Sequence, residues 1–140
     1  MLFTINPNDG LPIYRQIMRQ VKHAVASGRL APGDKLPSQR DLASELVVNH
    51  LTVKKAYEVL EAEGIIATER GRGTFVAAGV PDDLRVKGLR DIRARARDLA
   101  DAAQLMDLDF KGYRRLVDRA WTERRKEKGE RAWTSSNSRT

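Results

Sequence analysis

The fold is decided by residues 36–60, which read LPSQRDLASELVVNHLTVKKAYEVL. Ser38 can cap a short helix, and Asp41 lies three residues later, as in a capping box. Asn49 can cap a second helix. Each helix would have an apolar face at helical spacing, formed by Leu42 and Leu46 in the first and by Val53, Ala56, Tyr57 and Leu60 in the second. The stretch therefore predicts two helices joined by a short turn.

The flanking sequence adds a helix before this pair and a hairpin after it. Pro12 suits the first turn of a helix, and an apolar stripe follows at steps of four residues, formed by Ile13, Ile17, Val21 and Val25. After Gly64, residues 65–69 and 74–77 are two β-prone runs separated by a Gly-rich tip. This order is that of a winged helix-turn-helix, so the predicted fold class is mainly α with a small β-hairpin wing.

A helix-turn-helix suits DNA because an α-helix fits the major groove while the preceding helix braces it. The third helix is therefore the candidate recognition helix, and the hairpin tip suits a wing that enters the minor groove. The candidate contacts are Asn49, His50, Leu51, Thr52, Lys54 and Lys55 on the helix, and Arg70, Gly71, Arg72 and Gly73 in the wing. Two alternatives stay open: His50 as an exposed residue without a function, and Leu51 as a buried residue rather than a contact to a thymine methyl.

Several motifs in order and at matching spacing resemble the DNA-binding domain of the GntR family. They are 13–17 (IYRQI), 28–43 (GRLAPGDKLPSQRDLA), Thr52-Val53 with Ala56-Tyr57, and 71–76 (GRGTFV), and together they cover about the first half of the chain. The resemblance implies that Arg40 of the Leu-Pro-Ser-x-Arg segment contacts DNA beside Ser38, and that Gly71 reaches the minor groove. The sequence departs from the family pattern at Val47, which replaces a glycine, and at His50 and Leu51.

The second half of the chain predicts a helical dimerisation segment. The expected domains are 1–78 for DNA binding, 79–128 for dimerisation, and 129–140 as a disordered tail. Two apolar stripes at helical spacing are separated by a break, after which Asp109 can cap the second helix. We expect a second copy of the chain to cover both stripes. Their main members are Leu89, Ile92, Leu99, Phe110, Tyr113, Val117 and Trp121. The short segment is similar to that of the YtrA-like subfamily.

Composition favours an anionic partner and argues against several other classes. The formal net charge is +7 over 140 residues, which suits nucleic acid. Without Cys and with two His, no metal site is expected, and no nucleophile–base pair or cofactor loop suggests an enzyme. No apolar run reaches the roughly eighteen residues of a membrane span, and the first residues lack the features of a signal peptide, so we expect a cytoplasmic protein without cofactor.

These features predict a sequence-specific transcriptional regulator, with repression as the expected sign. It would bind a twofold-symmetric operator in double-stranded DNA as a homodimer, with an unidentified small molecule as a candidate effector. The alternative is a non-specific or architectural nucleic-acid-binding protein, whose affinity would depend steeply on salt.

Overall fold

The computed structural model describes the backbone of residues 3–137 and the side chains of residues 3–126. Its elements are α1 (Ile13–Ala26), β1 (Lys35–Leu36), α2 (Gln39–Leu46), α3 (His50–Ala62), β2 (Ile66–Glu69), β3 (Gly73–Val76), α4 (Leu84–Leu105) and α5 (Phe110–Asn137). The chain divides into two compact units, Met1–Asp91 and Ile92–Thr140. The first turns of α4 belong to the first unit, where Leu84 is buried.

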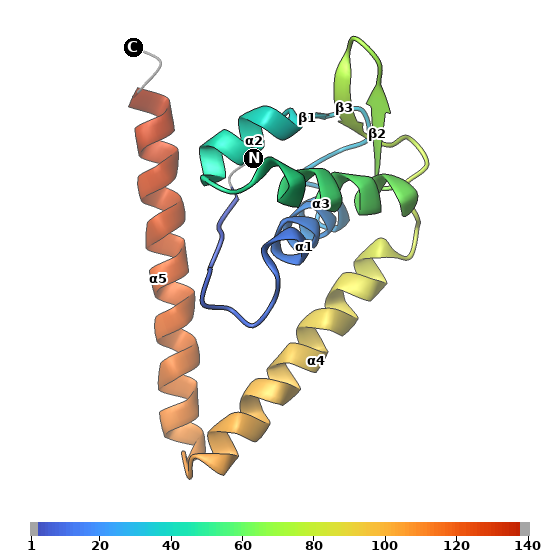
Figure 1. Ribbon diagram of the computed structural model, residues 1–140. Coiled ribbons are helices and arrows are strands. Elements are labelled where there is room, and N and C mark those ends of the chain that lie inside the picture. The colour runs from blue at the N-terminus through green and yellow to red at the C-terminus, as the bar shows by residue number, and fades with distance from the viewer. Residues whose placement is uncertain (1–2, 138–140) are drawn as a thin grey trace. The chain divides into compact units, whose positions relative to one another are not determined.

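The first unit is a winged helix-turn-helix, as the sequence predicts. Helices α1 and α2 both pack against α3 (Figure 1), and the predicted apolar faces form one core. Both predicted caps are confirmed: the Ser38 Oγ accepts from the Asp41 amide at 3.0 Å, and the Asn49 Oδ1 accepts from the Leu51 amide at 2.8 Å. These bonds fix where α2 and α3 begin.

Tyr57 ties α3 to the segment that leads into α2. Its ring is buried, and its hydroxyl donates to the Pro37 carbonyl at 2.7 Å. Burial raises the pKa of Tyr57 far above its usual value, because the phenolate would lose its hydration. The phenol therefore stays protonated and can keep donating to Pro37 over the physiological pH range.

A three-stranded antiparallel sheet in the order β1-β3-β2 carries the wing. Strands β2 and β3 pair from Ile66 with Val76 to Glu69 with Gly73, which confirms the predicted hairpin. The additional strand β1 pairs Lys35 with Phe75. Sequence patterning does not reveal β1 because two residues are too few to show an alternating pattern.

Val47 ends α2 in the left-handed conformation, with φ of 54° and ψ of 48°. A β-branched residue is rare in this conformation because its Cβ approaches the following carbonyl oxygen. The side chain is 88% exposed, so little packing offsets this cost. The glycine expected at this position by the family pattern would adopt the same backbone without strain.

Replacing Val47 with glycine is therefore expected to stabilise the first unit. Relief of the left-handed strain gains about 1–2 kcal/mol, and the greater freedom of glycine in the unfolded chain offsets roughly 0.5–1 kcal/mol of it. The free energy of unfolding, measured in denaturant at fixed protein concentration, should rise by about 0.5–1 kcal/mol. The matched control is Val48→Gly, which removes a side chain packed on the core and should destabilise the protein. A lower stability of the Val47→Gly variant would contradict the strain argument.

The second unit contains the remainder of α4 and α5. After α4, Asp107 adopts a φ of 57°, and the Asp109 Oδ1 accepts from the Gly112 amide at 2.8 Å, which confirms the predicted cap. Helix α5 extends to Asn137, so the helix includes residues 129–137 of the predicted tail, while residues 138–140 lie outside the described residues. Glu, Arg, Lys and Ala dominate residues 123–132, and these strong helix formers continue a helix that has already begun.

Over the described residues, none of the helices has both the length and the apolar character needed to cross a bilayer.

Candidate nucleic-acid interface

The amino-terminal turn of α3 presents an exposed, chemically mixed surface. Asn49, His50 and Lys54 are exposed, and Leu51 is 66% exposed, whereas Thr52 is partly buried. The opposite side of α3 supplies Val53 and its apolar neighbours to the core. Of the two alternatives for Leu51, burial in the core is therefore excluded, and its side chain is free to meet a partner.

Helix α2 brings a second cation close in sequence to this turn. Arg40 is exposed, and none of the ion pairs found among the described side chains involves it. Ser38, two residues earlier, is also exposed, with its hydroxyl oxygen accepting at the helix start. Since α2 packs on α3, the capped start of α2 and the start of α3 belong to one packed pair of helices.

The wing tip has the backbone freedom that a close approach to DNA would require. Gly71 has a φ of 80°, and a Cβ added there would meet nothing within 4 Å, so the tip is open to a ligand. Gly73 has a φ of 121°, and its added Cβ would lie 2.9 Å from the Lys35 Cε. Arg70 is exposed, while the Arg72 guanidinium lies 3.4 Å from the Glu69 carboxylate.

The two lysines of α3 have different surroundings. Lys54 is exposed and lies 3.9 Å from Glu58 on the next turn, a loose contact that leaves it available to a phosphate. The Lys55 ammonium instead lies 4.2 Å from the centre of the Tyr14 ring on α1. Lys55 thus faces a groove between α1 and α3. Its surroundings differ in this respect from those of the other candidate DNA contacts on α3.

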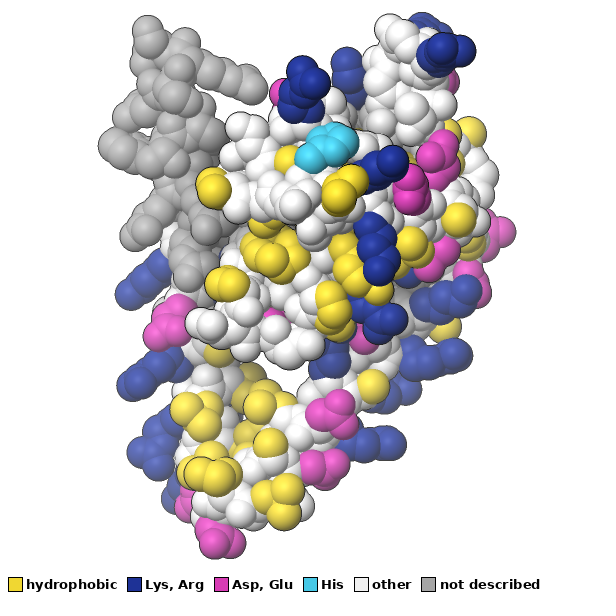
Figure 2. Space-filling model, viewed as in Figure 1, with side chains coloured by type: hydrophobic (Ala, Val, Ile, Leu, Met, Phe, Trp, Pro, Cys, Tyr) yellow, Lys and Arg dark blue, Asp and Glu magenta, His cyan; other side chains and the backbone are white. Residues whose placement is uncertain are grey.

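The space-filling view shows which kinds of side chain lie together on one face of the molecule. In Figure 2, Lys and Arg side chains lie around a histidine side chain, with hydrophobic side chains exposed among them. Such a surface combines charges for phosphates with hydrogen-bonding and apolar groups for base edges.

No cluster of His, Cys, Asp and Glu suited to a metal ion occurs within the described part of the chain.

The candidate dimerisation residues are uncovered in the single chain. Phe110 is 72% exposed, Trp121 is 71% exposed and Val117 is 39% exposed; Tyr113 is partly buried. Leu89, Ile92 and Leu99 on α4 are likewise exposed. Large apolar side chains at regular helical spacing are rarely left in water, which favours a further surface that covers them.

Comparison with known proteins identifies relatives of this chain. The family profile described as "Bacterial regulatory proteins, gntR family" matches residues 13–76. The Bacillus subtilis repressor YtrA is 50% identical over 76 residues, which are 54% of this chain and 58% of YtrA. The uncharacterised regulator YhcF of the same organism is 42% identical over 83 residues, 58% of this chain and 69% of YhcF. The chain thus spans less than two thirds of the length of YtrA.

Solved structures extend the similarity beyond the first unit. YtrA from Sulfolobus acidocaldarius, a GntR-family transcription factor, is 37% identical, with a TM-score of 0.53 over 86% of this chain and 97% of that chain. A Listeria monocytogenes protein described as a transcriptional antiterminator is 34% identical, with a TM-score of 0.59 over 86% of this chain and 90% of that chain. The relatives are transcriptional regulators rather than enzymes. From its motifs, fold and relatives, the chain belongs to the GntR family of bacterial regulatory proteins, in its YtrA-like group.

Proposed function

We propose that this protein is an operator-specific transcriptional repressor that binds DNA as a homodimer. The single observation that carries the proposal is the exposed amino-terminal turn of α3, whose other side is anchored in the core. In the complex, α3 enters the major groove and the tip between β2 and β3 enters the adjacent minor groove. The repressor function rests on similarity to YtrA, which is described as a repressor. Its site of action is the cytoplasm, where bacterial DNA lies.

Each side chain has a distinct task in this complex. Arg40 and Lys54 supply positive charge to phosphates or guanine edges, and His50 donates or accepts a hydrogen bond at a base edge. Leu51 offers an apolar surface to a thymine methyl, since it has no polar atom to exchange with a base. The Oδ1 of Asn49 is occupied by the helix cap, so its amide nitrogen is the part that remains to donate.

Homodimerisation gives the protein two recognition helices for a twofold-symmetric site. The uncovered apolar residues of α4 and α5 form the interface, and half-sites one helical turn apart, about 34–36 Å, suit such dimers. A closed twofold dimer covers the same apolar surface on both copies, which prevents further association.

The alternative function, non-specific binding, is favoured by one observation, the net charge of +7. Charge neutralisation of phosphates alone gives affinity without sequence preference and with a steep dependence on salt. The two functions differ in what Leu51 and His50 do, because non-specific binding needs neither.

The deciding experiment compares binding of the purified protein to the DNA upstream of its own gene and to a scrambled duplex at near-physiological salt. Operator-specific binding predicts a preference of about a thousandfold or more, and footprinting then gives the half-site spacing. If both duplexes bind equally, fragments selected from the whole genome decide: enrichment of one symmetric sequence supports the proposal, and no enrichment overturns it.

A further inference from the structure

The first unit has a groove that the DNA-binding function does not use. It is a cavity of about 780 Å³ between α1, the outer side of α3 and the first turns of α4. Its apolar lining includes Met18, Val59 and Leu84. Sites for small organic ligands commonly have volumes of about 300–1,000 Å³ and an apolar lining with a few polar groups, so both the size and the lining fit a small molecule.

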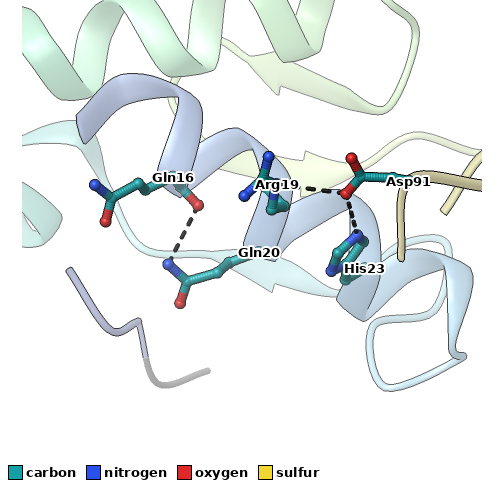
Figure 3. A network of polar contacts seen from close by, with 5 residues as sticks. All are labelled: Gln16, Arg19, Gln20, His23 and Asp91. Carbon is teal, nitrogen blue, oxygen red and sulfur yellow. Dashed lines mark hydrogen bonds and ion pairs between the residues drawn. The ribbon is translucent and has the colours of Figure 1, made fainter. Parts of the chain in front are cut away.

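The acidic residues of the groove are already paired with cations. Asp91 on α4 lies 3.6 Å from the Arg19 guanidinium and 3.6 Å from the His23 imidazole, both on α1 (Figure 3). Two further pairs, Lys22 with Glu63 at 2.6 Å and Lys87 with Asp83 at 3.1 Å, engage the other two carboxylates. Each of the three carboxylates in the lining is therefore already paired with a cation, and none of them is left to pair with another cation of the groove.

Two cations of the groove, Arg15 and Lys55, are not paired with a carboxylate of the lining, and both contact Tyr14. The Arg15 Nε donates to the Tyr14 hydroxyl at 3.1 Å, and the Lys55 ammonium lies 4.2 Å from the centre of the Tyr14 ring. Across the described residues, no acidic side chain pairs with Arg15 or Lys55. The pKa of Tyr14 is lowered, first by the hydrogen bond from Arg15 and also by the charges of Arg15 and Lys55, so the local field favours negative charge.

We infer that this groove is a binding site for a small organic anion. Arg15 and Lys55 hold its carboxylate, sulfonate or phosphate group beside Tyr14, and its apolar body lies against Met18, Val59 and Leu84. The sequence conceals the site, because Tyr14 belongs to an apolar helical stripe and Lys55 to the recognition helix. Only the fold brings α1, α3 and the start of α4 around one space.

The position of the groove suggests what the ligand does, and this step rests on the proposed function. Lys55 lies on α3, one turn after Leu51, whereas Leu84 lies on α4. A ligand that binds both elements stabilises the arrangements in which they lie close together. If operator binding favours another arrangement, the ligand lowers operator affinity by the same factor by which DNA lowers ligand affinity.

The test uses anilinonaphthalene sulfonate, a fluorescent organic anion with a large apolar body, titrated against the full-length protein without DNA. We expect saturable binding of one probe per chain. Arg15→Glu and Lys55→Glu should each weaken binding at least tenfold, because each reverses a charge that holds the sulfonate. The matched control is Arg29→Glu, which makes the same charge change at an exposed residue outside the groove and should leave the affinity unchanged.

Two results would overturn the anion site. One is non-saturable binding, and the other is equal affinity in the Arg15→Glu, Lys55→Glu and Arg29→Glu proteins, which would place the probe on other apolar surfaces. Circular dichroism confirms that each variant is folded, and Arg15→Ala replaces Arg15→Glu if the latter unfolds. Operator binding is measured separately: loss of sequence preference in the wild type removes the proposed repressor function, while the probe titration still decides the anion site.

Discussion

Replacing Arg40 with alanine is expected to lower operator affinity on the order of a hundredfold while leaving the fold and the dimer intact. A lost arginine contact costs about 1–3 kcal/mol at each site, and a dimer loses one contact at each half-site. Arg40 is exposed and lies in the first turn of α2, so its removal leaves no buried group without a partner. Fluorescence anisotropy with a labelled operator, at fixed salt, measures the effect, and sedimentation reports the oligomeric state.

The control for Arg40 is Arg90→Ala, which removes the same charge from an exposed residue of α4. Its operator affinity should fall far less, because a charge outside the interface contributes only through the screened field of the whole protein. Equal losses in the two variants would indicate general electrostatic attraction and favour non-specific binding. Unchanged affinity of the Arg40→Ala protein would remove Arg40 from the interface.

The local signals for the helix-turn-helix were visible in the sequence because they involve neighbouring residues. Ser38 and Asn49 accept hydrogen bonds from backbone amides two or three residues away, and such caps depend little on the rest of the fold. The apolar spacing of α3 likewise identifies its buried side without knowledge of the partner. Once the buried side of α3 is known, the residues on its opposite side, such as His50 and Leu51, become the candidate contacts.

Features that depend on tertiary contacts were not visible. The sequence assigns Lys55 to the DNA-facing group, but its ammonium lies over Tyr14, forty-one positions earlier in the chain. The groove also requires that Asp91 on α4 meet α1, which no local pattern indicates. Helix propensity favours α5 over residues 123–132, but the polar character of residues 129–140 predicts disorder from the sequence alone.

The sequence shows that Val47 departs from the glycine of the family pattern, but it does not show why glycine suits this position. The family pattern marks the position as unusual, and the structure supplies the reason that glycine suits it, a left-handed backbone at the end of α2. His50 and Leu51, the other two departures, open α3 three and four residues later, so the differences from the family cluster where the proposed DNA contacts lie. This placement makes operator preference the property in which the protein should differ most from its relatives.

Replacing Trp121 with glutamate is expected to convert the protein to monomers and to lower operator affinity by roughly a hundredfold to ten-thousandfold. Phe110, Val117 and Trp121 recur along one face of α5 at the helical period, and a charge buried in a dimer interface there would lose its hydration without gaining a partner. Two half-site contacts joined in one dimer gain about 10²–10⁴ in affinity over separate ones. Sedimentation equilibrium gives the mass, and anisotropy with the full operator gives the affinity.

The matched control is Arg119→Glu, since Arg119 lies on the opposite face of α5 and is exposed. That variant should remain dimeric, although it also acquires a negative charge within two residues of Trp121. Val117→Asp provides a second disruption at a less exposed position of the same stripe and should also give monomers. Dimers that persist in both Trp121→Glu and Val117→Asp would exclude this face of α5 as the interface. Monomers that still bind the full operator with wild-type affinity would separate dimerisation from DNA recognition, because the gain from two linked half-sites would then be absent.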